Sequence, residues 1–225
     1  MAIVRFWGML DDAEKAELRR FGRERAYKPG ERVVAETDTD RWTGVIVDGV
    51  CRVTGNRGDG SRSYLAARGP GDIIGEMASL RERRRTAEVT ALTRTVVHVL
   101  PASKFQRLLE LHPGITRHLL NVALDRLHEA DQNRTDLAVA ATELRLNRML
   151  LRLVHAEGVP TRNPRCVTLT GVAQTDLAEW CGVSRTSVQR QLRRLTELGV
   201  LRPGPRYRQL TILDTAELTA YSREP

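Results

Sequence analysis

Residues 174–195 read QTDLAEWCGVSRTSVQRQLRRL, and this stretch decides the fold of the C-terminal part of the chain. Leu177 and Trp180 supply apolar positions of a first helix, which Gly182 then interrupts. Ser184 is a favourable N-cap for a second helix, because its hydroxyl can accept from backbone N–H groups of the first turn. The spacing predicts two helices joined by a tight turn.

The second helix of this pair has a clear division into faces. Val188, Leu192 and Leu195 repeat at four and three residues, which predicts one buried face. The remaining positions are rich in Arg and Gln, which suit a DNA major groove, since Arg can donate two bonds to guanine and Gln can pair with adenine. We therefore predict a helix-turn-helix that binds double-stranded DNA. The predicted contacts on it are Ser184, Arg185, Thr186, Ser187, Gln189 and Arg190.

A short hairpin is predicted after this unit. Residues 200–202 and 209–212 flank a Pro- and Gly-containing turn, in which Arg206 and Arg208 are placed to contact phosphates. An amphipathic helix pair with a solvated basic face would give a similar pattern. The coincidence of the turn glycine, the serine cap, the arginines and the basic hairpin favours DNA binding.

The bulk composition agrees with a polyanionic partner. The chain has 225 residues and a formal net charge of +8, which suits DNA, RNA or an acidic membrane surface. It shows no signal peptide and no apolar run of about 20 residues, so we expect a cytoplasmic protein with no membrane association. Its three cysteines are far apart and lack CxxC spacing, so we expect no metal site and no cofactor. No catalytic constellation stands out, and we expect no enzyme activity.

The N-terminal half is predicted to be β structure. Short β-like runs separated by turn signals, without a long helix between them, are typical of a sandwich, jelly roll or barrel. Asp48-Gly49 between two such runs predicts a hairpin. A short amphipathic helix at 12–20 precedes the strands. The predicted runs are 32–36, 44–47, 50–54, 61–67, 86–92 and 95–100.

One long helix is predicted next, after a helical segment at 102–111 and a restart at Pro113. A helix over 115–144 would be roughly 45 Å long and would need a partner along its length. A seam in steps of three and four favours a parallel homodimer, although a buried core helix of a monomer would share the pattern. The seam comprises Leu120, Ala123, Leu127, Ala130, Arg134, Leu137, Ala141 and Leu144.

The order of these parts resembles the cyclic-AMP receptor protein/FNR (CRP/FNR) family of bacterial transcription regulators over almost the whole chain. The resemblance implies an α+β fold with a cyclic-nucleotide-binding β jelly roll at 1–112, a dimerisation helix at 113–146 and a winged helix-turn-helix at 147–225. Residues 182–190, GVSRTSVQR, are similar to the start of the family's recognition helix. Arg185 and Arg190 match its DNA contacts, whereas Thr186 replaces the common Glu and predicts a different operator preference.

A second motif resembles the phosphate-binding cassette of cyclic-nucleotide domains. It consists of residues 75–80, GEMASL, followed by Arg85-Thr86-Ala87. The resemblance implies that N–H groups of a short helix after Gly75 and the Arg85 guanidinium bind the cyclic phosphate. It also implies that Glu76 accepts from the ribose hydroxyl and that Thr86 adds a contact. The cassette positions predicted to line the ligand are Gly75, Glu76, Met77, Ala78, Arg85 and Thr86.

The residues expected near the base of the nucleotide do not decide which effector binds. Ala130 and Asp131 stand where cyclic-AMP-responsive relatives carry hydroxyl residues on the long helix. Asp131 can accept from adenine or from guanine, so both cyclic AMP and cyclic GMP remain candidates. The alternatives are a regulator that needs no ligand, or one that senses redox state, haem or another small molecule. The resemblance further implies a palindromic operator and RNA polymerase as a partner, contacted near residues 157–165.

Overall fold

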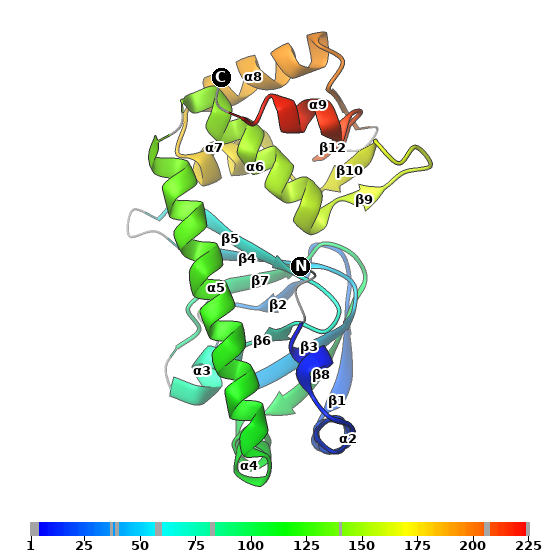
Figure 1. Ribbon diagram of the computed structural model, residues 1–225, viewed down its shortest axis with the longest axis vertical. Helices are drawn as coiled ribbons and strands as arrows, with labels where there is room; N and C mark the ends of the chain where they lie inside the picture. Colours follow the sequence, from blue (N-terminus) through cyan, green and yellow to red (C-terminus); the bar gives the residue numbers. More distant parts are fainter. Residues whose placement is uncertain are drawn as a thin grey trace. The chain divides into compact units, whose positions relative to one another are not determined.

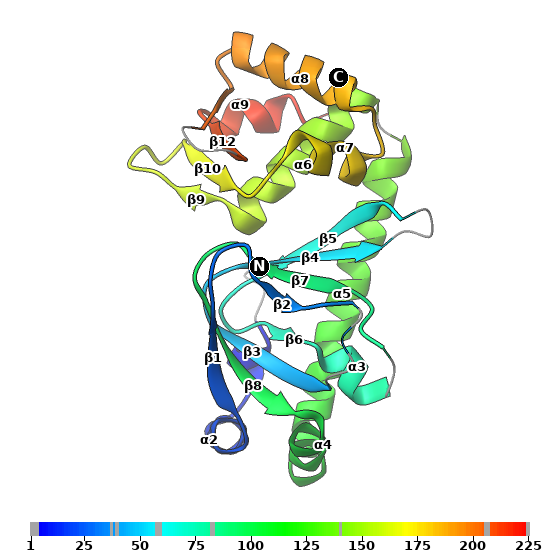
Figure 2. The same ribbon diagram turned by 180° about the vertical axis from the view of Figure 1, so that it is seen from behind.

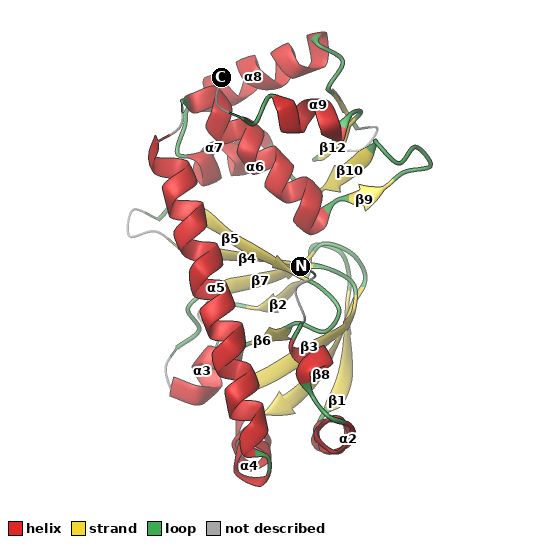
Figure 3. Ribbon diagram, in the orientation of Figure 1, coloured by secondary structure: helices red, strands yellow, loops and turns green. Residues whose placement is uncertain are grey.

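In the computed structural model of this chain, the described residues are 5–36, 38, 41–56, 60–81, 84–139, 141–204 and 208–223, without the side chains of 81 and 132–139. Helices and antiparallel sheets are both present, which confirms the α+β class (Figure 3). By its contacts the chain divides into two compact units. The first unit comprises Met1–Gly55 and Leu65–Ala130, and the second comprises Asn56–Tyr64 and Asp131–Pro225.

The first unit contains most of a β roll of two four-stranded sheets, visible in Figure 2, and residues 62–64 at the start of β5 belong to the second unit. One sheet has the order β1-β8-β3-β6 and the other the order β2-β7-β4-β5. Their facing side chains form a shared core that includes Tyr27, Ile46, Cys51 and Val97. The strands are β1 Arg23–Tyr27, β2 Arg32–Val34, β3 Trp42–Asp48, β4 Cys51–Asn56, β5 Arg62–Arg68, β6 Ile73–Ile74, β7 Glu88–Ala91 and β8 Thr95–Pro101.

The turn at Asp48-Gly49 is present, but the hairpin predicted from it is wrong. Gly49 has φ +88°, and a Cβ there would lie 2.5 Å from the Arg94 carbonyl oxygen. However, the two flanking strands lie in different sheets, because each pairs with a strand distant in sequence. β3 pairs with β8 and β6, whereas β4 pairs with β7. The turn therefore connects the two layers of the roll, a long-range pairing that the local pattern does not encode.

Helices α2 and α4 lie at one end of the roll, and α5 runs along its side, as Figure 1 shows. The capping box of Asp11 and Glu14 begins α2, and its Leu18 packs in a second core with Phe105 and Ile115. The short helix α3 follows Gly75, as the cassette resemblance implied. The helices are α1 Phe6–Met9, α2 Asp12–Phe21, α3 Glu76–Arg81, α4 Ala102–Leu111 and α5 Pro113–Val139.

The long helix is shorter than the sequence predicted. α5 ends at Val139, and Ala141 adopts an extended conformation with φ −56° and ψ 153° as the N-cap of α6 (Thr142–Glu157). Ala141 and Leu144 therefore do not continue the seam on α5, and the side chains of Arg134 and Leu137 lie outside the described residues. The physical reason is that α6 must turn its own apolar face into the core of the second unit, where it buries Leu146 and Leu150.

The second unit is a winged helix. Its helices α6, α7 and α8 pack around Leu177, Val188 and Leu195, and α9 closes the core with Leu218. A four-stranded sheet of order β11-β12-β10-β9 forms the wing. Within the described part of the chain, no helix is long and apolar enough to cross a membrane. The elements are β9 Val159–Pro160, β10 Val167–Thr170, α7 Gln174–Cys181, α8 Arg185–Glu197, β11 Leu201–Pro203, β12 Gln209–Ile212 and α9 Thr215–Ala220.

Candidate DNA interface and sensor site

The helix-turn-helix has the predicted local structure. Gly182 ends α7 in the left-handed region at φ 62°, where a residue with a side chain is strained. Ser184 caps α8, because its hydroxyl accepts from the Ser187 backbone N–H at 3.1 Å. The predicted hairpin is also confirmed, since β11 pairs antiparallel with β12, Leu201 opposite Ile212.

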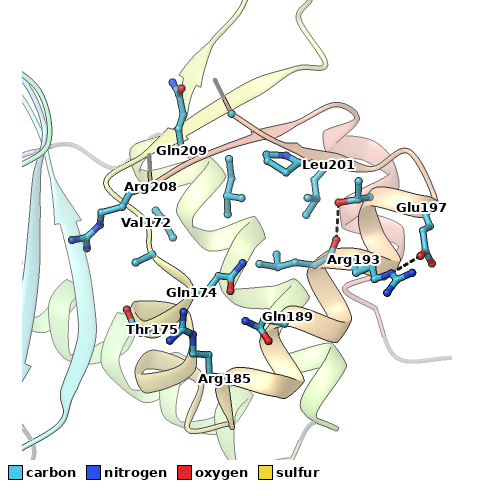
Figure 4. A pocket seen from close by; sticks show the side chains of 16 residues that line it. Val172, Gln174, Thr175, Arg185, Gln189, Arg193, Glu197, Leu201, Arg208 and Gln209 are labelled. Atoms are coloured by element: carbon cyan, nitrogen blue, oxygen red, sulfur yellow. Dashed lines mark hydrogen bonds and ion pairs between the residues drawn. The ribbon is translucent and has the colours of Figure 1, made fainter. Parts of the chain in front are cut away.

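The two faces of α8 separate as the pattern predicted. Val188, Leu192 and Leu195 are buried at 0%, 6% and 1% exposure. The opposite face is solvent-exposed and lines a groove of about 630 Å³ between α8, the start of α7 and the wing (Figure 4). Of the six predicted contact residues, Arg185 and Gln189 line this groove, and the DNA contacts of all six stay a prediction. Ser184, Arg185, Thr186, Gln189 and Arg190 are exposed, and Ser187 is half-buried.

The wing arginines have different outcomes. Arg206 lies outside the described residues. Arg208 has a positive φ of 59°, and its guanidinium pairs with the Asp176 carboxylate of α7. The same guanidinium donates to the Gly171 carbonyl oxygen at 3.5 Å. Arg208 therefore joins the wing to the first helix of the motif, and its predicted phosphate contact stays a prediction.

In the first unit, the fold brings the two ends of the cassette together. Gly75 has φ +77°, and a Cβ there would lie 2.6 Å from Nη1 of Arg85 and 2.8 Å from the Trp42 carbonyl oxygen. Arg85 donates to the carbonyl oxygens of Gly75 and Trp42, both at 2.9 Å, and its guanidinium lies 5.0 Å from the centre of the Trp42 ring. At 5% exposure, the cation expected to bind phosphate is held inside the roll.

Glu76, the other charged cassette residue, is paired with a residue that the sequence reasoning missed. Nη1 of Arg126 on α5 donates to Glu76 Oε1 at 2.6 Å, and its Nη2 donates to the Ile73 carbonyl oxygen at 2.6 Å. Burial lowers the pKa of Arg126, and the Glu76 carboxylate opposes this shift. The available signal was positional, because Arg126 continues the face of α5 that Ile115 and Leu119 bury in the roll.

The remaining predicted ligand positions are spread over different environments. Ala78 is buried, whereas Met77 is 48% exposed and Thr86 is exposed. Asp131 is an exposed residue of α5 and belongs to the second unit, so its role toward the cassette stays a prediction. Among the residues that the structure describes, no group of three His, Cys, Asp or Glu side chains is arranged to hold a metal ion.

Comparison with known proteins matches both units. The family model of the cyclic nucleotide-binding domain matches residues 24–112, and that of the Crp-like helix-turn-helix domain matches residues 144–221. This succession of two domains decides the assignment. The chain belongs to the CRP/FNR family.

Individual relatives of this CRP/FNR regulator have names that refer to different signals or processes. It is 28% identical over 200 residues to the cyclic AMP receptor protein of Thermus thermophilus, covering 89% of this chain and 88% of that protein. It is 25% identical over 196 residues to the nitrogen fixation regulation protein FixK of Bradyrhizobium diazoefficiens, covering 85% and 79%. The structure of the c-di-GMP responsive regulator CLP of Xanthomonas campestris shares its fold, with TM-score 0.74, 22% identity and coverage of 90% and 99%.

Membership of the CRP/FNR family settles the general activity. The chain is a DNA-binding transcriptional regulator and not an enzyme. The groove also contains Arg193, which belongs to the Arg- and Gln-rich face of α8 predicted to suit a major groove but was not among the predicted contacts. Arg193 lines it together with Arg185 and Gln189, at steps of four residues along α8. That spacing was the available signal. Arg193 also pairs with Glu197 at 2.9 Å, at the far end of the helix.

Proposed function

We propose that this regulator acts as a homodimer on a palindromic operator and that a cyclic nucleotide, cyclic AMP or cyclic GMP, controls it through the β roll. The observation that carries the nucleotide assignment is the gathering of Gly75, Glu76 and Arg85 at the start of α3. A buried guanidinium supplies the positive charge that a cyclic phosphate needs, and a carboxylate supplies an acceptor for a ribose hydroxyl.

Binding at this site requires an exchange of partners. Arg85 donates to two backbone carbonyl oxygens, and Glu76 accepts from Arg126. A phosphate would replace two neutral carbonyl acceptors by an anion, so that the Arg85 guanidinium would gain an ion pair of the bidentate kind that Arg and phosphate form. The exchange therefore favours the ligand at Arg85, and it provides a local change of structure that binding would drive. A ligand controls DNA binding only through such a difference in affinity for two states.

A second candidate is a regulator that needs no ligand. It is favoured by the same contacts, because both charged residues of the cassette already have partners inside the chain. A third candidate is a redox or metal sensor, and the environment of Cys51 argues against it. Burial raises the pKa of the Cys51 thiol to about 12, and thiolate rather than thiol is the reactive and metal-binding form.

Calorimetric titration with cyclic AMP and with cyclic GMP separates these candidates. The proposal predicts heat of binding with at least one of them, loss of that heat in Arg85→Gln, and its retention in Arg84→Gln. Arg84 is the matched control, because it is an exposed arginine next in the chain and loses the same charge. Absence of heat with both nucleotides, together with operator binding that neither nucleotide alters, would instead support the ligand-independent candidate.

The dimer proposal rests on a second apolar face of α5. Ile115 and Leu119 are buried in the roll, at 0% and 7% exposure. Leu120, Leu124 and Leu127 lie at steps of four and three on a different face, and they are 59%, 55% and 56% exposed in the single chain. Such a stripe on a helix is the pattern that a partner helix covers. A second copy of this chain would cover it symmetrically.

Sedimentation tests the dimer directly. Leu124→Glu combined with Leu127→Glu places like charges across the proposed interface and should give a monomer. Asn121→Glu is the control, since it adds the same charge at an exposed position on another face of α5. A double variant that still sediments as a dimer would place the interface elsewhere.

A dimer of this kind would present two α8 helices to DNA. We infer half-sites about 34 Å apart, one turn of the double helix, with Arg185, Thr186, Gln189 and Arg190 at base edges. We also infer RNA polymerase as a partner, contacted through the exposed connection at 159–165. Substitutions there should leave operator affinity unchanged and alter transcription in a purified system.

A further inference from the structure

The buried face of α8 contains one polar side chain. Gln191 lies beside Val188 and Leu192 and is 5% exposed. Its Nε2 donates to Oδ1 of Asn147 on α6 at 2.9 Å, and Asn147 is 4% exposed. Nδ2 of Asn147 in turn donates to the carbonyl oxygen of Tyr221, the C-cap of α9, at 2.8 Å. We call the side chains of Asn147 and Gln191 the amide relay.

Stability is a poor explanation for this relay. Within the described part of the chain, Oε1 of Gln191 is buried and has no hydrogen-bond partner. A buried carbonyl oxygen without a partner is unfavourable, and an apolar side chain of similar size would avoid that penalty. Replacing both members of a buried polar pair by apolar groups is often neutral or stabilising. The relay is therefore better explained by the geometry that it enforces.

That geometry concerns the rotation of α8 about its own axis. Apolar contacts such as those of Val188 are non-directional, so they tolerate small rotations. A hydrogen bond is restricted in both distance and angle. A second polar link between α8 and α6 joins Arg194 to Glu143 at 2.6 Å. These side chains are 58% and 47% exposed, and exposed ion pairs hold geometry weakly. The buried link is the stronger constraint.

We propose that Asn147 and Gln191 are positioning residues for base readout. The relay fixes the rotation of α8 against α6, and so sets which base edges the exposed residues Arg185, Gln189 and Arg190 reach. Functional groups need placement within about 0.5 Å and 10–20° to act productively. This inference rests on the proposed readout by α8.

The test compares specific with non-specific DNA binding. The variant is the double substitution Asn147→Leu with Gln191→Met, which exchanges the relay for apolar side chains of similar size. The control is Leu192→Met, a change on the same buried face that leaves the relay intact. Affinities are measured by fluorescence anisotropy at one salt concentration, because phosphate contacts make them salt-dependent. The probes are a duplex that the wild-type chain selects from random DNA and a scrambled duplex of equal length.

The expected result is a loss of discrimination without a loss of stability. The ratio of specific to non-specific affinity should fall about ten-fold or more in the double variant, which corresponds to misplacing one two-bond base contact. Its affinity for the scrambled duplex should stay within about two-fold. Its urea midpoint should stay close to that of wild type, because the Tyr221 carbonyl oxygen that loses its donor belongs to an exposed residue. Leu192→Met should keep the ratio.

Three outcomes would overturn the proposal. They are an unchanged ratio in the double variant, an equal loss in Leu192→Met, and a double variant that unfolds early or fails to fold, since the last would make the relay a structural support. Arg190→Ala separates this inference from the proposed readout. If Arg190→Ala keeps the ratio of specific to non-specific affinity, the proposed readout by α8 is wrong. If Arg190→Ala lowers this ratio but the double variant keeps it, only the role of the relay is refuted.

Discussion

Replacement of Arg126 by Met tests how much the contacts of Arg126 with Glu76 and Ile73 stabilise the cassette. The variant keeps most of the side-chain volume but removes both donors, the one at 2.6 Å from Glu76 Oε1 and the one at 2.6 Å from the Ile73 carbonyl oxygen. Removing one partner of a fully buried ion pair costs about 3–5 kcal/mol, whereas exposed pairs contribute about 1 kcal/mol or less. The two side chains are 24% and 11% exposed. We therefore expect a loss of about 2–3 kcal/mol in the free energy of unfolding.

Three further variants should differ from Arg126→Met in how much free energy of unfolding they lose. Glu76→Gln keeps an acceptor oxygen and leaves behind the more exposed partner, so it should cost less, about 1 kcal/mol. Arg126→Met combined with Glu76→Leu removes both charges of this pair and should recover most of the loss. Arg117→Met, at an exposed position of α5, is the control and should stay within about 0.5 kcal/mol of wild type.

Urea unfolding followed by circular dichroism measures these free energies. Hydrogen exchange over β6 and α3 shows whether the loss is local to the cassette. A cost below about 1 kcal/mol for Arg126→Met, or a double variant less stable than either single variant, would refute the reasoning that the pair is buried and coupled.

The other predictions concern a turn, a cap and a thiol. Gly75→Ala should destabilise the first unit by more than about 1 kcal/mol in urea unfolding, because its Cβ would clash with Arg85 and Trp42 at a positive φ; an unchanged midpoint would contradict this. Ser184→Ala should cost about 1 kcal/mol and weaken operator binding, whereas Ser184→Asn should not. The folded pKa of Cys51, about 12, lies above its ordinary 9.0, so stability should fall as pH rises from 9 toward 12. Cys51→Ala should flatten that fall, and an unchanged slope would assign it to other groups.

The local patterns of the second unit were sufficient for prediction. The cap at Ser184, the turn at Gly182 and the apolar steps on α8 all depend on residues a few positions apart, and the structure confirms each of them. The cassette helix after Gly75 followed from resemblance, and its position next to Arg85 is confirmed by contact.

Long-range features were not predictable from the same patterns. The Asp48-Gly49 turn has the backbone that its residues favour, but β3 and β4 lie in different sheets, where they pair with β8 and β7 from much later in the chain. The sequence around the end of α5 contains no Gly or Pro that would predict this end. The packing of α6, and not local helix propensity, determines where α5 stops. Arg126 and the amide relay are charged or polar residues on otherwise apolar faces. Their partners become visible only when distant elements are brought together.

Selection from random duplex DNA tests the central claim, that α8 reads a palindromic operator as part of a dimer, most directly. The purified wild-type chain should enrich a two-fold symmetric sequence with half-sites one helical turn apart. Arg185→Ala and Arg190→Ala should each weaken the preference at one position per half-site, with a cost of about 1–3 kcal/mol for that base. The account would be contradicted if the wild-type chain enriched no sequence, or if both variants enriched the same consensus as the wild type.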